Sequence, residues 1–149
     1  MPTRVSIPIL TVLLIALSGT AAADRVFTPE VLENGRVITT EEAKDLLGNA
    51  QFFDMRKPLN FGKGHVEGAS PLPYDQKSAK AVEFDASVDR FDLSQLPTDK
   101  DQALVFYSDG PTGWKSYKAA VLAIRAGYTN VMWMRNGFAG WTAKRFPIE

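Results

Sequence analysis

The sequence predicts one α/β domain with a central, mostly parallel five-stranded sheet flanked by helices. Two observations carry this prediction. Short runs of apolar and β-branched residues alternate along the chain with amphipathic stretches that have helix start and stop signals. The run at 103–107 is almost wholly apolar, which is typical of a strand covered on both faces. Strands that alternate with helices in this way favour a parallel sheet.

Residues 1–23 have the pattern of a secretory signal peptide. Arg4 supplies a positive start, an apolar run follows at 5–17, and small residues at Ala21 and Ala23 fit cleavage before residue 24. An uncleaved membrane anchor is the alternative, but the apolar run is short for a span of about 20 residues. We therefore expect an exported protein, periplasmic or secreted, without a membrane span after cleavage. The expected parts are a signal peptide at 1–23, an N-terminal extension at 24–35 and one domain at 36–149.

The composition limits the chemistry that the chain can carry. Of the 149 residues, 17 are lysine or arginine, 17 are aspartate or glutamate, and none is cysteine. The balanced charge gives no electrostatic case for nucleic acid binding. The absence of cysteine excludes thiolate catalysis, disulfides and cysteine-ligated metal sites, and a single histidine offers too few ligands for a transition metal. We expect neither a metal nor a cofactor.

The first elements follow from local signals. Residues 24–35 are irregular and polar, and they are expected to cross the surface before a short strand at 36–38. Thr39 and Glu42 have the spacing of a capping box, which predicts a helix that runs to about residue 47. Gly48 follows as a typical helix end.

The middle of the chain is expected to hold short elements joined by long connections. The connection at 74–102 is unusually long for a compact domain, and we expect it to contribute to specificity. The elements predicted here are, in order, a strand at 51–54, a helical turn at 58–61, a glycine-bracketed turn at 64–70, a strand at 69–72, a helix at 77–83 and a second short helix anchored by Phe91, Leu93 and Leu96.

The last third of the chain returns to the strand–helix alternation. A strand at 103–107 leads through a loop of small residues into a helix at about 116–126. Such a loop aims backbone N–H groups and the positive end of a helix dipole at one point, which predicts an anion site within 105–120. A buried strand at 130–134 and a short helix at 138–143 complete the domain.

Three separate stretches resemble one known family, the rhodanese-like domains. Their order along the chain is the order expected of that family, and together they cover nearly all of 36–141. The resemblance implies a rhodanese-like fold for the domain at 36–149. The matching stretches are the Asp-x-Arg of Asp54 to Arg56 with the Gly-His-x-x-Gly-Ala turn at 64–69, the loop and helix at 105–120, and the closing pattern at 126–131 and 137–141.

The loop is most similar to a subgroup of small exported rhodanese-like proteins, but it lacks the reactive atoms. That subgroup carries a cysteine, then Gly-Pro, then a second cysteine followed by tryptophan. Ser108 and Gly113 stand where the two cysteines belong, while Gly110-Pro111 and Trp114 match. Rhodaneses transfer sulfur through a persulfide on the first cysteine, and a hydroxyl cannot replace that thiolate. The resemblance therefore implies a sulfurtransferase-family protein that is inactive in persulfide chemistry.

The candidate site is the loop together with three supporting residues. Ser108 either fills the volume of the cysteine or, with a base beside it, acts as a nucleophile. Asp109 is either an acid or base or simply solvated, and its charge opposes an anion. The site residues are Ser108, Asp109, Gly110, Pro111, Thr112, Gly113, Trp114, Lys115 and Ser116, supported by Asp54, Arg56 and His65.

Other residues of the site also have two interpretations each. Lys115 attracts an anion or points into water, and the hydroxyls of Thr112 and Ser116 add donors or belong to the helix start. Arg56 reaches the mouth of the loop, as the family position implies, or forms a structural salt bridge. Trp114 covers one side of a pocket or contacts a partner.

Three functions fit these observations. The leading hypothesis is an exported, non-catalytic rhodanese-like domain that binds a small anion or a periplasmic partner protein through its former active-site loop. The second is a hydroxyl-based hydrolase or phosphotransferase at Ser108. The third is a structural or interaction role within an exported redox or catabolic system in which cysteine-bearing relatives act.

Overall fold

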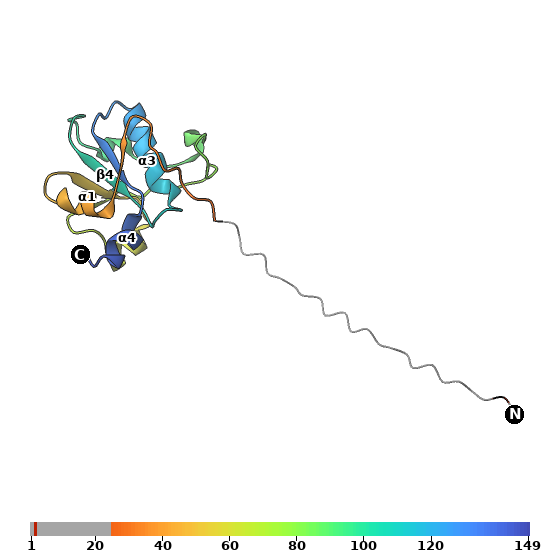
Figure 1. Cartoon of the computed structure of the whole chain (residues 1–149). Coiled ribbons are helices and arrows are strands. Elements are labelled where there is room, and N and C mark those ends of the chain that lie inside the picture. Colours follow the sequence, from red (N-terminus) through yellow and green to blue (C-terminus); the bar gives the residue numbers. More distant parts are fainter. Residues whose placement is uncertain (1, 3–24) are drawn as a thin grey trace.

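Five parallel strands form the central sheet of the computed structural model, which describes residue 2 and residues 25–149 (Figure 1). The strand order is β1-β5-β4-β2-β3, and every pairing is parallel. The predicted α/β class and the mostly parallel five-stranded sheet are therefore confirmed. The strands are β1 (Arg36–Ile38), β2 (Gln51–Asp54), β3 (Ser70–Pro71), β4 (Leu104–Tyr107) and β5 (Val131–Met134).

Helices cover both faces of the sheet. The α-helices are α1 (Thr40–Asp45), α2 (Pro58–Lys63), α3 (Trp114–Arg125) and α4 (Gly137–Ala143), and two 3₁₀ turns are η1 (Ala86–Val88) and η2 (Leu93–Gln95). The capping box of α1 is present: Thr39 Oγ1 accepts from the Glu42 N–H at 3.1 Å, and Glu42 Oε2 accepts from the Thr39 N–H at 2.7 Å. These bonds satisfy two backbone donors at the start of the helix.

The strands alternate their side chains between two apolar layers. On β4, Leu104 and Phe106 join the layer packed against α3, while Val105 and Tyr107 join the layer that contains residues of α1 and α4. All four β4 residues are buried, as predicted for a strand covered on both faces. Because both faces of β4 are packed, the position of its carboxyl end, where the candidate loop begins, is fixed within the domain.

The helix predicted at 77–83 is wrong. The Ala81 N–H donates to the Ala79 carbonyl at 3.0 Å instead of to the Lys77 carbonyl, as a helix would require. The segment is held by Asp89, whose carboxylate accepts from the N–H groups of Lys77 and Ser78, both at 2.7 Å. The same carboxylate accepts from the hydroxyls of Tyr74 and Ser78. Burial alone would raise the pKa of Asp89, but these hydrogen bonds outweigh it and lower the pKa to about 2. The connection is therefore folded around one carboxylate.

Nearly all of the predicted signal peptide lies outside the described residues. Within the part of the chain that the structure describes, no helix combines the length and the apolar character that a bilayer crossing requires. The continuous described stretch, 25–149, begins at Arg25, inside the predicted N-terminal extension.

Candidate functional site

The candidate loop joins the carboxyl end of β4 to α3, the position at which parallel α/β sheets place ligands. Gly113 is the N-cap of α3, so the helix begins at Trp114, two residues before the predicted start at 116. The start of α4 braces the loop: the Phe138 and Ala139 N–H groups donate to the carbonyls of Ser108 and Asp109 at 2.8 and 2.9 Å. These bonds make the loop backbone part of the packed domain.

Glycine is required at residue 137 by this close approach. Its φ is +60°, and a Cβ there would lie 2.6 Å from both the Ser108 carbonyl oxygen and the Gly110 nitrogen. A side chain at 137 would push α4 away from the loop.

The Ser108 hydroxyl lies inside a closed network of neutral hydrogen bonds. Ser108 is 1% exposed, and its Oγ donates to the Gly113 carbonyl at 3.0 Å and contacts Ser116 Oγ at 2.7 Å. Ser116 Oγ also accepts from the indole N–H of Trp133 at 2.9 Å. Every hydroxyl proton of this network has an acceptor, so the un-ionised form of Ser108 is stabilised.

Gly113 is coupled to Ser108 by direct contact. A Cβ on residue 113 would collide with Ser108 Oγ and would lie 2.9 Å from the Gly110 carbonyl oxygen. A residue with a side chain at 113 would therefore displace the hydroxyl from its present place. The two positions that resemble the subgroup's cysteines are thus not independent replacements, which the sequence pattern alone did not reveal.

His65 is engaged by other groups. Its ring stacks on Phe61 with centroids 3.7 Å apart, its Nδ1 is 3.0 Å from the Phe61 carbonyl, and its Nε2 is 3.4 Å from Glu149. None of these partners belongs to the Ser108 network. Among the described residues, no basic side chain therefore hydrogen-bonds Ser108 to activate it as a nucleophile.

Arg56 forms a buried salt bridge with Asp54. Its Nη2 donates to Asp54 Oδ2 and to the Gly64 carbonyl, both at 2.7 Å, and the guanidinium lies 4.0 Å from the centre of the Phe138 ring. Burial alone would lower the pKa of Arg56, but the hydrogen bonds and charge of Asp54 raise it. Tyr107 completes the group by donating to Asp54 at 2.7 Å. This geometry ties β2, β4 and the turn before β3 together.

The N-terminal segment from Arg25 to residue 35 holds the loop from outside. Thr28 donates to the Pro111 carbonyl through its N–H at 2.9 Å and its hydroxyl at 2.6 Å. The Trp114 indole donates to the Val26 carbonyl at 2.8 Å, and Arg135 donates to Thr28. In Figure 1 this segment, in orange, passes beside the start of α3. No local sequence signal marked these contacts, because they join residues more than 80 positions apart.

A hollow of about 200 Å³ opens in front of the loop. Two lysines and one carboxylate lie among its lining residues, so the local formal charge is +1. Gln76 and Lys80 come from the long connection at 74–102, and no local sequence signal marks these two residues. The lining residues are Gln76, Lys80, Ser108, Asp109, Thr112, Gly113, Trp114 and Lys115.

The predicted site residues are only partly brought together. Ser108, Asp109, Thr112, Gly113, Trp114 and Lys115 line the hollow, Ser116 lies beneath them, and Asp54, Arg56 and His65 make their polar contacts elsewhere. Over the described residues, no group of three or more His, Cys, Asp or Glu side chains could hold a metal ion.

Comparison with known proteins gives one consistent family. A family model described as a rhodanese-like domain matches residues 39–144. Thiosulfate sulfurtransferase 18 of Arabidopsis thaliana is 31% identical over 119 residues, which cover 75% of this chain and 82% of that protein. The chloroplastic thiosulfate sulfurtransferase 16 of the same plant is 26% identical over 104 residues, covering 70% and 83%.

A solved structure supports the fold. The protein RPA3614 from Rhodopseudomonas palustris, described as a possible tyrosine phosphatase, matches with a TM-score of 0.57 and 23% identity. The match covers 77% of this chain and 85% of that one.

Proposed function

The chain belongs to the rhodanese-like domain family, and from this premise we propose that it is an exported, non-catalytic member that binds a small anion at its former active-site loop. The loop mouth holds the anion by hydrogen bonds and charge, without a covalent intermediate. The observation that carries this proposal is the Ser108 network, in which the residue at the nucleophile position is buried and already hydrogen-bonded.

The start of α3 supports anion binding. No side chain caps the helix at Gly113, and the Trp114 N–H donates to the Thr112 carbonyl at 3.2 Å, so the other first-turn N–H groups are the donors at the positive end of the helix dipole. Lys80 and Lys115 line the same hollow and outweigh the charge of Asp109. The names of the plant relatives make thiosulfate the first anion to test.

Export rests on the signal-peptide pattern of residues 1–23. The expected mature protein begins at Asp24, and N-terminal sequencing of the periplasmic fraction checks this. Recovery of the uncut chain in a membrane fraction would contradict it.

The protein is expected to show no thiosulfate:cyanide sulfurtransferase activity, and Ser108→Cys is not expected to restore it. A side chain at this position faces the Gly113 carbonyl, which disfavours a thiolate, and burial raises the pKa of a thiol. The α3 dipole lowers that pKa by only about one unit. We expect the thiol to titrate at or above about 8.5, as measured by alkylation rate against pH. A much lower pKa with turnover would contradict the proposal.

Anion binding is expected to depend on the two lysines of the hollow. Lys80→Gln and Lys115→Gln should each weaken thiosulfate or sulfate binding about two- to fivefold, the usual size of one exposed charge contact. Asp109→Asn should strengthen it, because a repulsive charge is removed. Isothermal titration at low ionic strength measures the affinities, with Lys63→Gln as the control on α2. The absence of saturable binding would contradict the proposal and favour the partner-protein alternative.

A further inference from the structure

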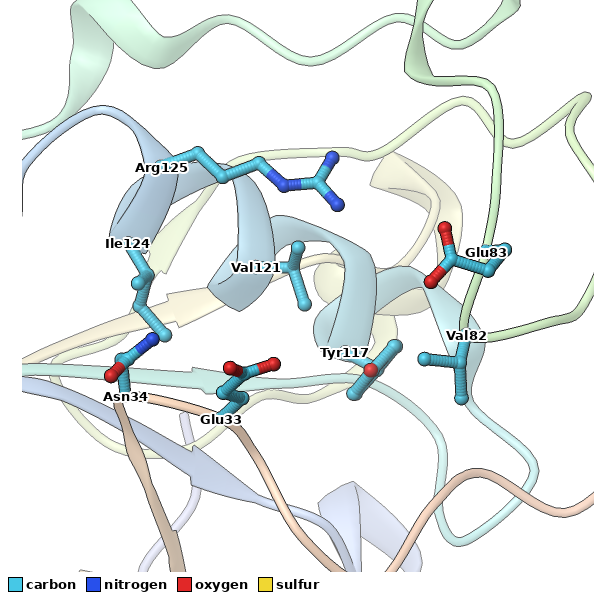
Figure 2. A pocket seen from close by; sticks show the side chains of 8 residues that line it. All are labelled: Glu33, Asn34, Val82, Glu83, Tyr117, Val121, Ile124 and Arg125. Atoms are coloured by element: carbon cyan, nitrogen blue, oxygen red, sulfur yellow. The ribbon is translucent and has the colours of Figure 1, made fainter.

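A second pocket, of about 140 Å³, lies on the outer face of α3 (Figure 2). Its floor is formed by helix residues, one wall by the N-terminal segment and the other wall by the long connection. None of its lining residues belongs to the hollow in front of the loop. The lining residues are Glu33, Asn34, Val82, Glu83, Tyr117, Val121, Ile124 and Arg125.

Tyr117 offers a hydrogen-bonding group at the floor of this pocket. The residue is 6% exposed, and its ring is fixed edge-on between Trp114 and Trp133, with centroid separations of 5.6 and 5.3 Å. Among the described residues no hydrogen bond is made by its hydroxyl, and the oxygen is not one of the buried atoms that lack a partner, so it is open to solvent at the pocket. Figure 2 shows this oxygen at the pocket.

Two carboxylates and one guanidinium line the same pocket as that hydroxyl. Glu33 comes from the N-terminal segment and Glu83 from the long connection, and Figure 2 shows them on either side of Tyr117. Neither forms a salt bridge within the described chain. Burial raises the pKa of Tyr117, while Arg125 lowers it and the two carboxylates raise it, which agrees with three charges close to one phenol.

Arg125, the last residue of α3, lies beside the long connection. Its guanidinium lies 5.6 Å from the centre of the Phe84 ring, a cation–π contact that keeps it beside the long connection. It cancels one of the two negative charges, so the lining residues carry a formal charge of −1. The pocket therefore favours a single positive charge and opposes an anion.

We propose that this pocket receives the lysine side chain of a partner protein. The methylene stem lies on Val121 and Ile124, and the ammonium group donates to Glu33, Glu83 and the Tyr117 oxygen. A lysine ammonium has three donors and no acceptor, which matches three separate oxygen acceptors. A planar guanidinium gains most from a bidentate carboxylate, whereas the three rotatable donors of an ammonium suit acceptors that lie in several directions.

The pocket is separate from the family's common features. Glu33 and Asn34 precede the matched family region at 39–144, so one wall is formed by a part of the chain outside that region. The proposal does not depend on anion binding at the loop, and each can fail without the other.

The test uses a blocked tripeptide, acetyl-Ala-Lys-Ala-amide, with its norleucine analogue as the uncharged control. Titration of the mature ¹⁵N-labelled protein should move amide signals of α3 with the lysine peptide and leave them unmoved with norleucine. Glu33→Gln and Glu83→Gln should each weaken binding about two- to fivefold. Glu67→Gln, an exposed carboxylate elsewhere on the surface, should leave binding unchanged.

Three results would overturn the proposal. Equal binding of the lysine and norleucine peptides would show that the carboxylates do not recognise charge. Unchanged affinity in the Glu33→Gln and Glu83→Gln variants would place binding elsewhere. Tighter binding of free n-butylammonium than of the peptide would assign the pocket to a small amine. Tyr117→Phe keeps the ring and should reduce affinity without changing the dispersion of the protein's spectrum.

Discussion

Replacing Asp54 by alanine is expected to lower the free energy of unfolding by about 3–5 kcal/mol, the usual effect of breaking a buried ion pair. Asp54 is fully buried and accepts hydrogen bonds from the Arg56 backbone and guanidinium and from the Tyr107 hydroxyl. Its removal leaves the Arg56 charge without its carboxylate in a site that is 5% exposed. Urea unfolding followed by far-ultraviolet circular dichroism measures the loss.

A double variant separates charge burial from lost packing. Asp54→Ala combined with Arg56→Met should be less destabilised than Asp54→Ala alone, because no unpaired charge remains. Glu41→Gln is the matched surface control. It removes an exposed salt bridge to Lys144 and should change stability little. A loss for Asp54→Ala no larger than that of the control would contradict the structural role assigned to the pair.

Trp133→Ala is expected to destabilise the protein by about 3–5 kcal/mol, in the range of large-to-small substitutions in cores. The side chain is fully buried on β5 and packs edge-on against Tyr117, with ring centroids 5.3 Å apart. Its indole N–H also donates to Ser116 at 2.9 Å, so the substitution removes a donor from the Ser108 network. Denaturant unfolding gives the stability change, and titration with thiosulfate reports the effect on the loop.

Trp133→Phe distinguishes packing from the hydrogen bond. Phenylalanine keeps most of the apolar contact and loses the indole donor. The expected loss in the free energy of unfolding is about 1 kcal/mol for the hydrogen bond plus a cavity contribution smaller than that of Trp133→Ala. Both variants should change thiosulfate binding at the loop, because both remove the Trp133 donor to Ser116. Equal destabilisation by phenylalanine and alanine would contradict the assignment of most of the energy to packing.

The strongest predictions from sequence concern features that depend on neighbouring residues. The capping box of Thr39 and Glu42 and the almost wholly apolar strand at 103–107 follow from residue order, and the structure contains both, the strand as β4 at Leu104–Tyr107. The position of Ser108 at the β4–α3 junction followed from the same strand–loop–helix pattern. Such signals are local, because they depend on periodicity and on hydrogen bonds that span three or four residues.

The helix wrongly predicted at 77–83 shows where local signals end. Its residues permit a helix, but the Ala81 N–H donates to the Ala79 carbonyl, and the segment is bound by Asp89, 11–12 residues further along the chain than Lys77 and Ser78. Local propensity is a weak prior that tertiary contacts override. The sequence contained Asp89 without showing what it would bind.

The sequence by itself determined the α/β class, the family resemblance and the loss of a thiol nucleophile, because each depends on residue identity and short-range order. Only the tertiary structure decided that Ser108 faces the Gly113 carbonyl, that Thr28 is bound to Pro111, and that Glu33 and Glu83 share one pocket. These facts depend on side-chain direction and on contacts between distant segments. Such contacts depend on one another, because each segment can make them only where the close packing of the two hydrophobic layers places it.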